Sequence, residues 1–149
     1  ATGARPGRSL NASHPHDEKT PMGFDRKNIV CAMSYIVAGM GLGVYMAATQ
    51  KHGQHVTHAH LLLVGFVTSL AYGVIHKLWL DASRRTLAWV QFIAHHAGAV
   101  GMCTGLFLLY GGFVQAERLE PLLGAASMGI LLGAAAMLFM VLSSRDLRT

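Results

Sequence analysis

Four long apolar runs are the feature that most constrains the fold of this 149-residue chain. They cover residues 29–48, 59–80, 87–110 and 122–142, and hardly a formal charge interrupts them. Each has about 20 residues or more, which at about 1.5 Å per helical residue crosses a hydrocarbon core of roughly 30 Å. A segment in lipid must satisfy its backbone hydrogen bonds internally, so we expect helices. The sequence predicts an all-α integral membrane protein, a four-helix bundle in contact with the lipid bilayer.

The segments outside these runs are polar and short. Residues 1–28 are rich in Pro, Gly, Ser and charge without a periodic apolar pattern, so we predict a disordered cytoplasmic tail. Residues 29–143 form the predicted bundle, and residues 144–149 form a second cytoplasmic tail. Because the connections between the runs are short, helices that are neighbours in sequence are expected to pack antiparallel.

The basic residues are distributed unevenly between the two sides of the predicted membrane. Lys51 and Arg118 lie in the first and third loops, and the other ten lie in the tails or around the second loop: Arg5, Arg8, Lys19, Arg26, Lys27, Lys77, Arg84, Arg85, Arg145 and Arg148. The positive-inside rule then places both termini in the cytoplasm and the histidine-rich first loop in the periplasm. We interpret the net charge of +5 as a marker of topology and not of nucleic-acid binding.

Two histidines, His58 and His60, stand one residue apart at the head of the second run. Imidazoles are good ligands for metals and for haem iron. On a helix the two rings point about 200° apart, so one ion held by both is not expected. Two separate partners, one for each ring, fit this spacing better.

A second pair, His95-His96, falls inside the third run. His95 follows Arg85 by ten residues, which is roughly 15 Å along a helix and places the pair near the middle of the membrane. Ionisable residues inside spans are costly, so they indicate a functional site by default. The two side chains point about 100° apart, so at most one of them faces a given cofactor.

The remaining candidates are weaker. His52, His55 and His58 recur every three residues and would share a helical face that could bind copper or zinc, although flexible loop histidines are the competing interpretation. Cys31 and Cys103 fall at different depths, so we expect two inert thiols and no disulfide. The runs contain no Asp or Glu, which counts against a proton-driven transporter.

The segment from His58 to Trp79 resembles a helix of the heme–copper oxidase catalytic subunits, most closely in their C-type branch. The shared pattern is His58-Ala59-His60 followed by Gly65-Phe66, and then Lys77-Leu78-Trp79. The run from Gln91 to Gly98 is similar to the helix that follows in that family. The resemblance implies that His58 corresponds to the proximal ligand of a high-spin haem and His60 to a ligand of a low-spin haem. The oxidase helices that carry the copper ligands have no counterpart in four spans, so a complete oxidase is not expected.

The sequence thus leads to a functional hypothesis. We predict a haem b protein of the bacterial inner membrane that transfers electrons or binds a diatomic gas, since no C-x-x-C-H is present for covalent attachment. The best pair of iron ligands is His60 with His96, and His58 and His95 are their alternatives. We expect a homo-oligomer, or a subunit that works with a respiratory-chain or cytochrome partner. The alternative is a copper- or zinc-binding, or oxidase-assembly, accessory protein that uses the outer-face histidines, with His52 and His55 beside His58 and His60.

Overall fold

The computed structural model describes residues 22–80 and 84–144, and every regular element in those residues is a helix. The elements are α1 (Phe24–Thr49), α2 (His55–His60), the π-helix η1 (Leu61–Val67), α3 (Thr68–Leu78), α4 (Arg85–Tyr110) and α5 (Ala116–Leu142). Because α2, η1 and α3 are continuous, they make one span from His55 to Leu78. In the part of the chain that the structure describes, four helices are therefore long and apolar enough to cross a membrane, which confirms the predicted all-α class and supports the predicted membrane bundle.

All four spans begin earlier than the apolar runs suggested, and the difference is largest for α1 and α5. α1 begins at Phe24 instead of residue 29, and α5 begins at Ala116 instead of residue 122. The first turn of α1 contains Asp25 and that of α5 contains Glu117. An acidic side chain stabilises a helix N-terminus, so the helix can extend into these charged turns outside the hydrocarbon. The predicted tails fall mostly on residues 1–21 and 145–149, which lie outside the described residues.

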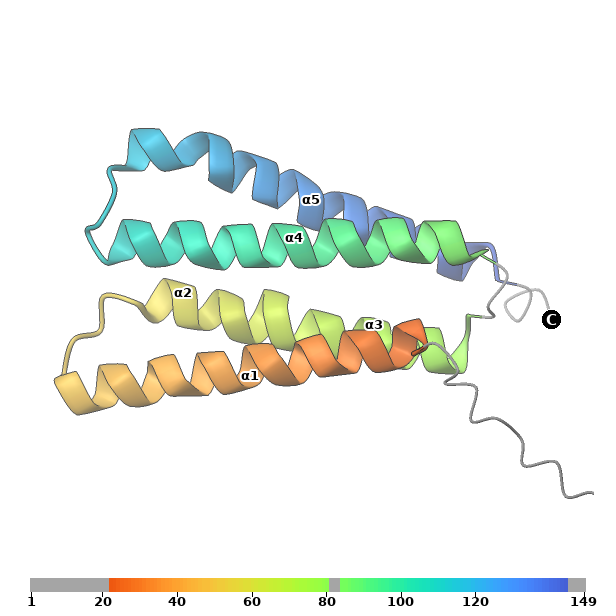
Figure 1. The fold of residues 1–149 in the computed structure, drawn as a ribbon, viewed down its shortest axis with the longest axis horizontal. Helices are drawn as coiled ribbons and strands as arrows, with labels where there is room; N and C mark the ends of the chain where they lie inside the picture. Colours follow the sequence, from red (N-terminus) through yellow and green to blue (C-terminus); the bar gives the residue numbers. More distant parts are fainter. Residues whose placement is uncertain (1–21, 81–83, 145–149) are drawn as a thin grey trace, which may run out of the picture.

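Each span returns alongside the one before it (Figure 1). α1 packs against η1 and α3, while α4 packs against α2 and η1 on one side and along α5 on the other. We call the end of the bundle where α1 begins the Phe24 end, and the opposite end the His52 end. At the Phe24 end, α3, α4 and α5 share a core of Tyr72, Ala88, Met137 and Met140.

The contact between α4 and α5 depends on glycine. A Cβ atom at Gly98 would lie 2.7 Å from the backbone oxygen of Ala126, and one at Gly133 would lie 2.8 Å from the Cβ atom of His95. No larger residue fits at these positions while the helices keep their spacing. Glycines at these positions let the two helix backbones approach closely, which is the usual way for helices to pack in lipid, where no hydrophobic driving force acts between them.

Candidate functional site

The ring of His58 lies against α1. Its Nδ1–H donates to the carbonyl of Gly39 at 2.8 Å, and a Cβ atom at Gly43 would lie 3.1 Å from its Cε1 atom. Interhelical hydrogen bonds of this kind stabilise helix pairs in membranes. His58 therefore connects the first two spans, and the absent side chain at Gly43 makes room for its ring.

His60 is oriented by its own helix. Its Nδ1–H donates to the carbonyl of Val56 at 2.9 Å, and the residue is half-buried. Within the described residues no hydrogen bond reaches its Nε2 atom. A donor at Nδ1 fixes the tautomer in which Nε2 carries a lone pair, which is the form of imidazole that binds metals. The Nε2 atom of His60 thus has a free lone pair that a metal ion could accept.

The π-helix η1 follows directly after His60. Its wider turns are marked by Thr68, whose hydroxyl donates to the carbonyl of Leu63, five residues earlier, at 2.9 Å. At Gly65, inside η1, a Cβ atom would lie 2.6 Å from the ring of Tyr35 on α1. Short π segments inside helices often occur at functional sites. The apolar pattern of this run gave no signal for the π-helix.

His96 belongs to a closed hydrogen-bonded group. Its Nε2–H donates to Oδ1 of Asn28 at 3.2 Å, and its Nδ1 accepts from the hydroxyl of Tyr35 at 3.2 Å. The Nδ2 atom of Asn28 donates to the carbonyl of Phe24 at 2.8 Å. Both ring nitrogens of His96 are therefore occupied, and binding iron would require one of these buried hydrogen bonds to break.

His95 is fully buried and only partly satisfied. Its Nε2 atom lies 3.2 Å from the hydroxyl of Ser69, and the edge of the Tyr72 ring packs against it at 4.9 Å between centroids. Its Nδ1 atom has no hydrogen-bond partner. The Nε2 atom of Gln91, one turn earlier on α4, also has no hydrogen-bond partner. The Oε1 atom of Gln91 accepts a hydrogen bond from Nε2–H of His76 at 3.2 Å. A buried polar atom without a partner costs about 1–3 kcal/mol, so these two atoms are the least satisfied polar groups of the site.

The two histidine pairs lie at different depths. Ser69, the partner of His95, follows His60 by nine residues in the same span. At about 1.5 Å per residue the two levels are separated by roughly 13 Å, slightly less where the π turns are shorter. A haem held by His60 and His96 of one chain does not fit this arrangement, because the rings are far apart along the bundle and His96 has no free nitrogen.

The histidines of the first loop are exposed. Nδ1–H of His55 donates to the carbonyl of His52 at 3.0 Å, and the His55 ring lies 6.3 Å from that of Tyr110. In residues 22–80 and 84–144 no three metal-ligating side chains of His, Cys, Asp or Glu come together. A copper or zinc site there stays a prediction.

Four polar residues of the site, three of them buried and Tyr35 half-buried, were not singled out from the sequence. Asn28, Tyr35, Ser69 and Gln91 pair with the histidines of α3 and α4, and Asn28, Ser69 and Gln91 are fully buried. Ser69, which follows Thr68, and Gln91 are among the few polar residues inside the apolar runs. Because such residues in lipid need internal partners, their positions could have indicated the network.

Comparison with known proteins adds no further assignment: no family model matches the sequence, and neither the curated proteins nor the solved structures gave a match. The fold and the buried polar groups define the class, a multi-pass helical membrane protein with intramembrane histidines.

Proposed function

We propose that this chain is a haem b-binding membrane protein that transfers electrons or binds a diatomic gas. The observation that supports the proposal is the state of His60, whose Nδ1–H is bonded to the Val56 carbonyl while its Nε2 atom is left free. Histidines that bind metals usually donate their other ring N–H to a carbonyl or carboxylate. The chain would supply this axial ligand and an apolar surrounding, and the haem would supply the redox or gas-binding chemistry.

The other predicted ligands fit less well than His60. His58 has the same Nδ1–H to carbonyl bond, but its ring packs against α1 beside Gly43. His95 keeps one free nitrogen in a fully buried position, where Gly133 already packs against its backbone. His96 has both nitrogens bonded. In our proposal His60 is therefore the axial iron ligand supplied by this chain, whereas the sequence predicted the pair His60 and His96.

A second axial ligand, in this proposal, comes from outside the chain. His60 of a second copy would give six-coordinate iron, which suits electron transfer in a homo-oligomer. A respiratory-chain or cytochrome partner would serve equally if the chain is a subunit of a larger complex. Iron held by His60 alone would have an open position, which suits a diatomic gas.

We also propose an orientation in the bacterial inner membrane. Arg26, Lys27 and Arg85 lie at the Phe24 end, whereas Lys51 and Arg118 lie at the His52 end. With the Phe24 end and both termini in the cytoplasm, the basic excess follows the positive-inside rule. His60 then lies in the periplasmic half of the membrane. This placement and the resemblance of the His58–Trp79 segment to a heme–copper oxidase helix both support the proposal of a haem at His60.

The absorption spectrum of the purified protein tests the haem proposal. We expect a Soret band, with sharp α and β bands after reduction, when the protein is produced with a haem supply. His60→Ala should lose these bands, while the matched loop variant His52→Ala should keep them. A protein that stays colourless with haem available would refute the proposal. If stoichiometric copper or zinc is present instead and is lost in His52→Ala, the metal-binding alternative holds.

A further inference from the structure

Two hydrogen-bonded pairs of side chains connect α3 to α4 inside the bundle. Ser69 pairs with His95, and His76, seven residues further along α3, pairs with Gln91, each at 3.2 Å. Since α3 runs towards the Phe24 end, the His76 pair lies about 10 Å nearer that end than the Ser69 pair. Gln91 and His95 are four residues apart, so their side chains lie on the same face of α4.

Each pair leaves one nitrogen atom without a partner. The two atoms are Nε2 of Gln91 and Nδ1 of His95, and both residues are 0% exposed. Buried polar atoms in native proteins are nearly always hydrogen-bonded, so an unsatisfied one needs an explanation. Lipid does not provide a partner here, because both residues are enclosed by protein and acyl chains carry no polar group. The partner that fits is small, polar and able to enter between α3 and α4.

The groups around His95 favour water over an ion as this partner. Ser69 and Tyr72 face the ring from α3, Gly133 packs against it from α5, and the His96 ring lies 5.1 Å away on the same helix. None of these groups supplies a counter-charge. A water molecule can accept from the amide N–H of Gln91 and donate to the imidazole, whose Nε2–H then donates to Ser69.

The outer pair lies where the bundle meets the solution. His76 belongs to the last turn of α3, is half-buried, and precedes the exposed Lys77. Its ring stacks on that of Phe24 at 5.6 Å between centroids. The polar atoms of His76 and Gln91 thus lead inwards from the Phe24 end to His95.

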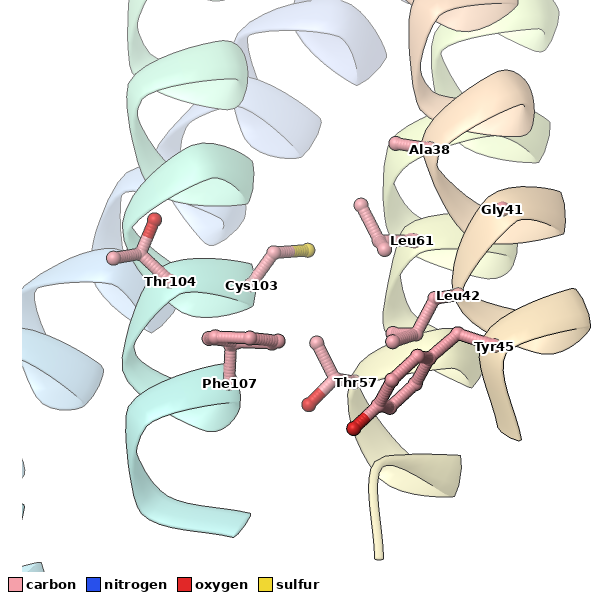
Figure 2. A pocket seen from close by; sticks show the side chains of 9 residues that line it. All are labelled: Ala38, Gly41, Leu42, Tyr45, Thr57, Leu61, Cys103, Thr104 and Phe107. Carbon is pink, nitrogen blue, oxygen red and sulfur yellow. The ribbon is translucent and has the colours of Figure 1, made fainter. Parts of the chain in front are cut away.

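The polar path does not continue to the His52 end. There the space between α1 and α4 is a groove of about 490 Å³ whose walls are mainly apolar (Figure 2). Figure 2 shows Ala38 and Leu42 on α1 and Phe107 on α4 among its lining residues, and no histidine lines it. The path to His95 therefore opens at the Phe24 end only.

We propose that a water molecule binds between Gln91 and His95 and carries protons between His95 and the solution at the Phe24 end. A proton that enters as hydronium passes to Nδ1 of His95, where a new N–H bond forms, and neutral water remains. The reverse step returns the proton to water. Gln91 is a positioning residue that holds the water, and His76 forms the polar entrance. The proposal does not depend on haem binding.

Hydrogen–deuterium exchange at the Cε1 atoms of the histidine rings tests this proposal. This slow exchange requires a proton on both ring nitrogens and access of solvent base, and fragmentation in the mass spectrometer assigns it to single residues. In the purified full chain we expect His95 to exchange about tenfold faster than His96, although His95 is 0% exposed and His96 is 8% exposed. If the pairs served packing alone, His95 would be at least as well protected as His96.

Three variants make the test specific. Gln91→Met keeps the length of the side chain but removes its polar atoms, so it should slow exchange at His95 about tenfold, the worth of one hydrogen bond to the water. His76→Phe keeps a ring beside Phe24 and should also slow it. Gln115→Met makes the same chemical change at an exposed position at the opposite end, and it should leave His95 unchanged.

Equal protection of His95 and His96 in the native chain would overturn the proposal, and so would unchanged exchange at His95 in Gln91→Met. Circular dichroism checks that each variant keeps its helices. If Gln91→Met does not fold, unchanged exchange in His76→Phe overturns the proposal in its place. Since none of these readouts involves a haem spectrum, failure here and failure of the haem proposal are distinguishable.

Discussion

Substitution of Gly98 by alanine should separate α4 from α5. In the structure a Cβ atom at this position would lie 2.7 Å from the backbone oxygen of Ala126 and 2.8 Å from the backbone nitrogen of Ile130. The first distance is about 0.7 Å shorter than the 3.4 Å at which ordinary contact begins. Both obstructing atoms belong to a helix backbone, so no side chain can rotate away. The helices must therefore move apart.

The cost of this movement is set by overpacking, which is typically about 1–3 kcal/mol for one added methyl group. The matched control is Gly124→Ala on α5, where the new methyl group meets nothing within 4 Å. That control should be neutral or gain up to about 1 kcal/mol, because alanine is the better helix former. The two variants should thus differ by about 1–4 kcal/mol in the free energy of unfolding.

Unfolding in mixed micelles of increasing SDS content, followed by far-ultraviolet circular dichroism, measures this difference. Gly98→Ala should unfold at a lower SDS fraction than the native chain, and Gly124→Ala at the same fraction or a higher one. Equal midpoints for the two variants would mean that α4 and α5 are not in close backbone contact. The packing described here would then be wrong.

Three further predictions use different parts of the molecule. Tyr35→Phe removes the donor to Nδ1 of His96 and should lower the free energy of unfolding by about 1 kcal/mol in the same SDS assay; an unchanged value would contradict the hydrogen bond. His58→Ala removes the bond to the Gly39 carbonyl, so it should reduce stability while leaving any haem spectrum intact, and loss of the spectrum would move the ligand from His60 to His58. In a background without the two native cysteines, Gly53→Cys should react with an impermeant maleimide from the periplasm and Ser144→Cys should not; the reverse pattern would invert the proposed topology.

The spans could be predicted from the sequence because lipid imposes one strong rule on them. A segment of apolar residues that is long enough to cross the bilayer has to be helical, whatever surrounds it. The ends of the helices could not be predicted as well. α1 and α5 begin in charged turns, and hydropathy alone does not assign charged residues to a span. The packing of α4 against α5 could not be predicted in the same way, because small residues four apart, such as Gly39 and Gly43 or Gly101 and Gly105, occur in every span and do not say which spans meet.

The histidine site was harder to predict, because ligand and structural histidines look alike in a sequence. His96 seemed the best partner for His60 as long as only its depth and residue type were known. Asn28 lies 68 positions away along the chain and Tyr35 lies 61, so their bonds to His96 depend entirely on how α1 packs against α4. The π-helix was unpredictable for a similar reason, since η1 forms where Gly65 admits the ring of Tyr35.

The separation of roles between His58 and His60 follows from the geometry of their helix. Two residues apart, the rings point about 200° from each other, so only one of them can face α1. That one is His58. The carbonyl of Gly39 accepts its hydrogen bond, and the absent side chain at Gly43 makes room for its ring. His60 must then face away from α1, where the described residues offer its Nε2 atom no donor. A lone pair left in this position in lipid is unfavourable unless a partner arrives, and iron or a second chain is the kind of partner that an imidazole nitrogen recognises.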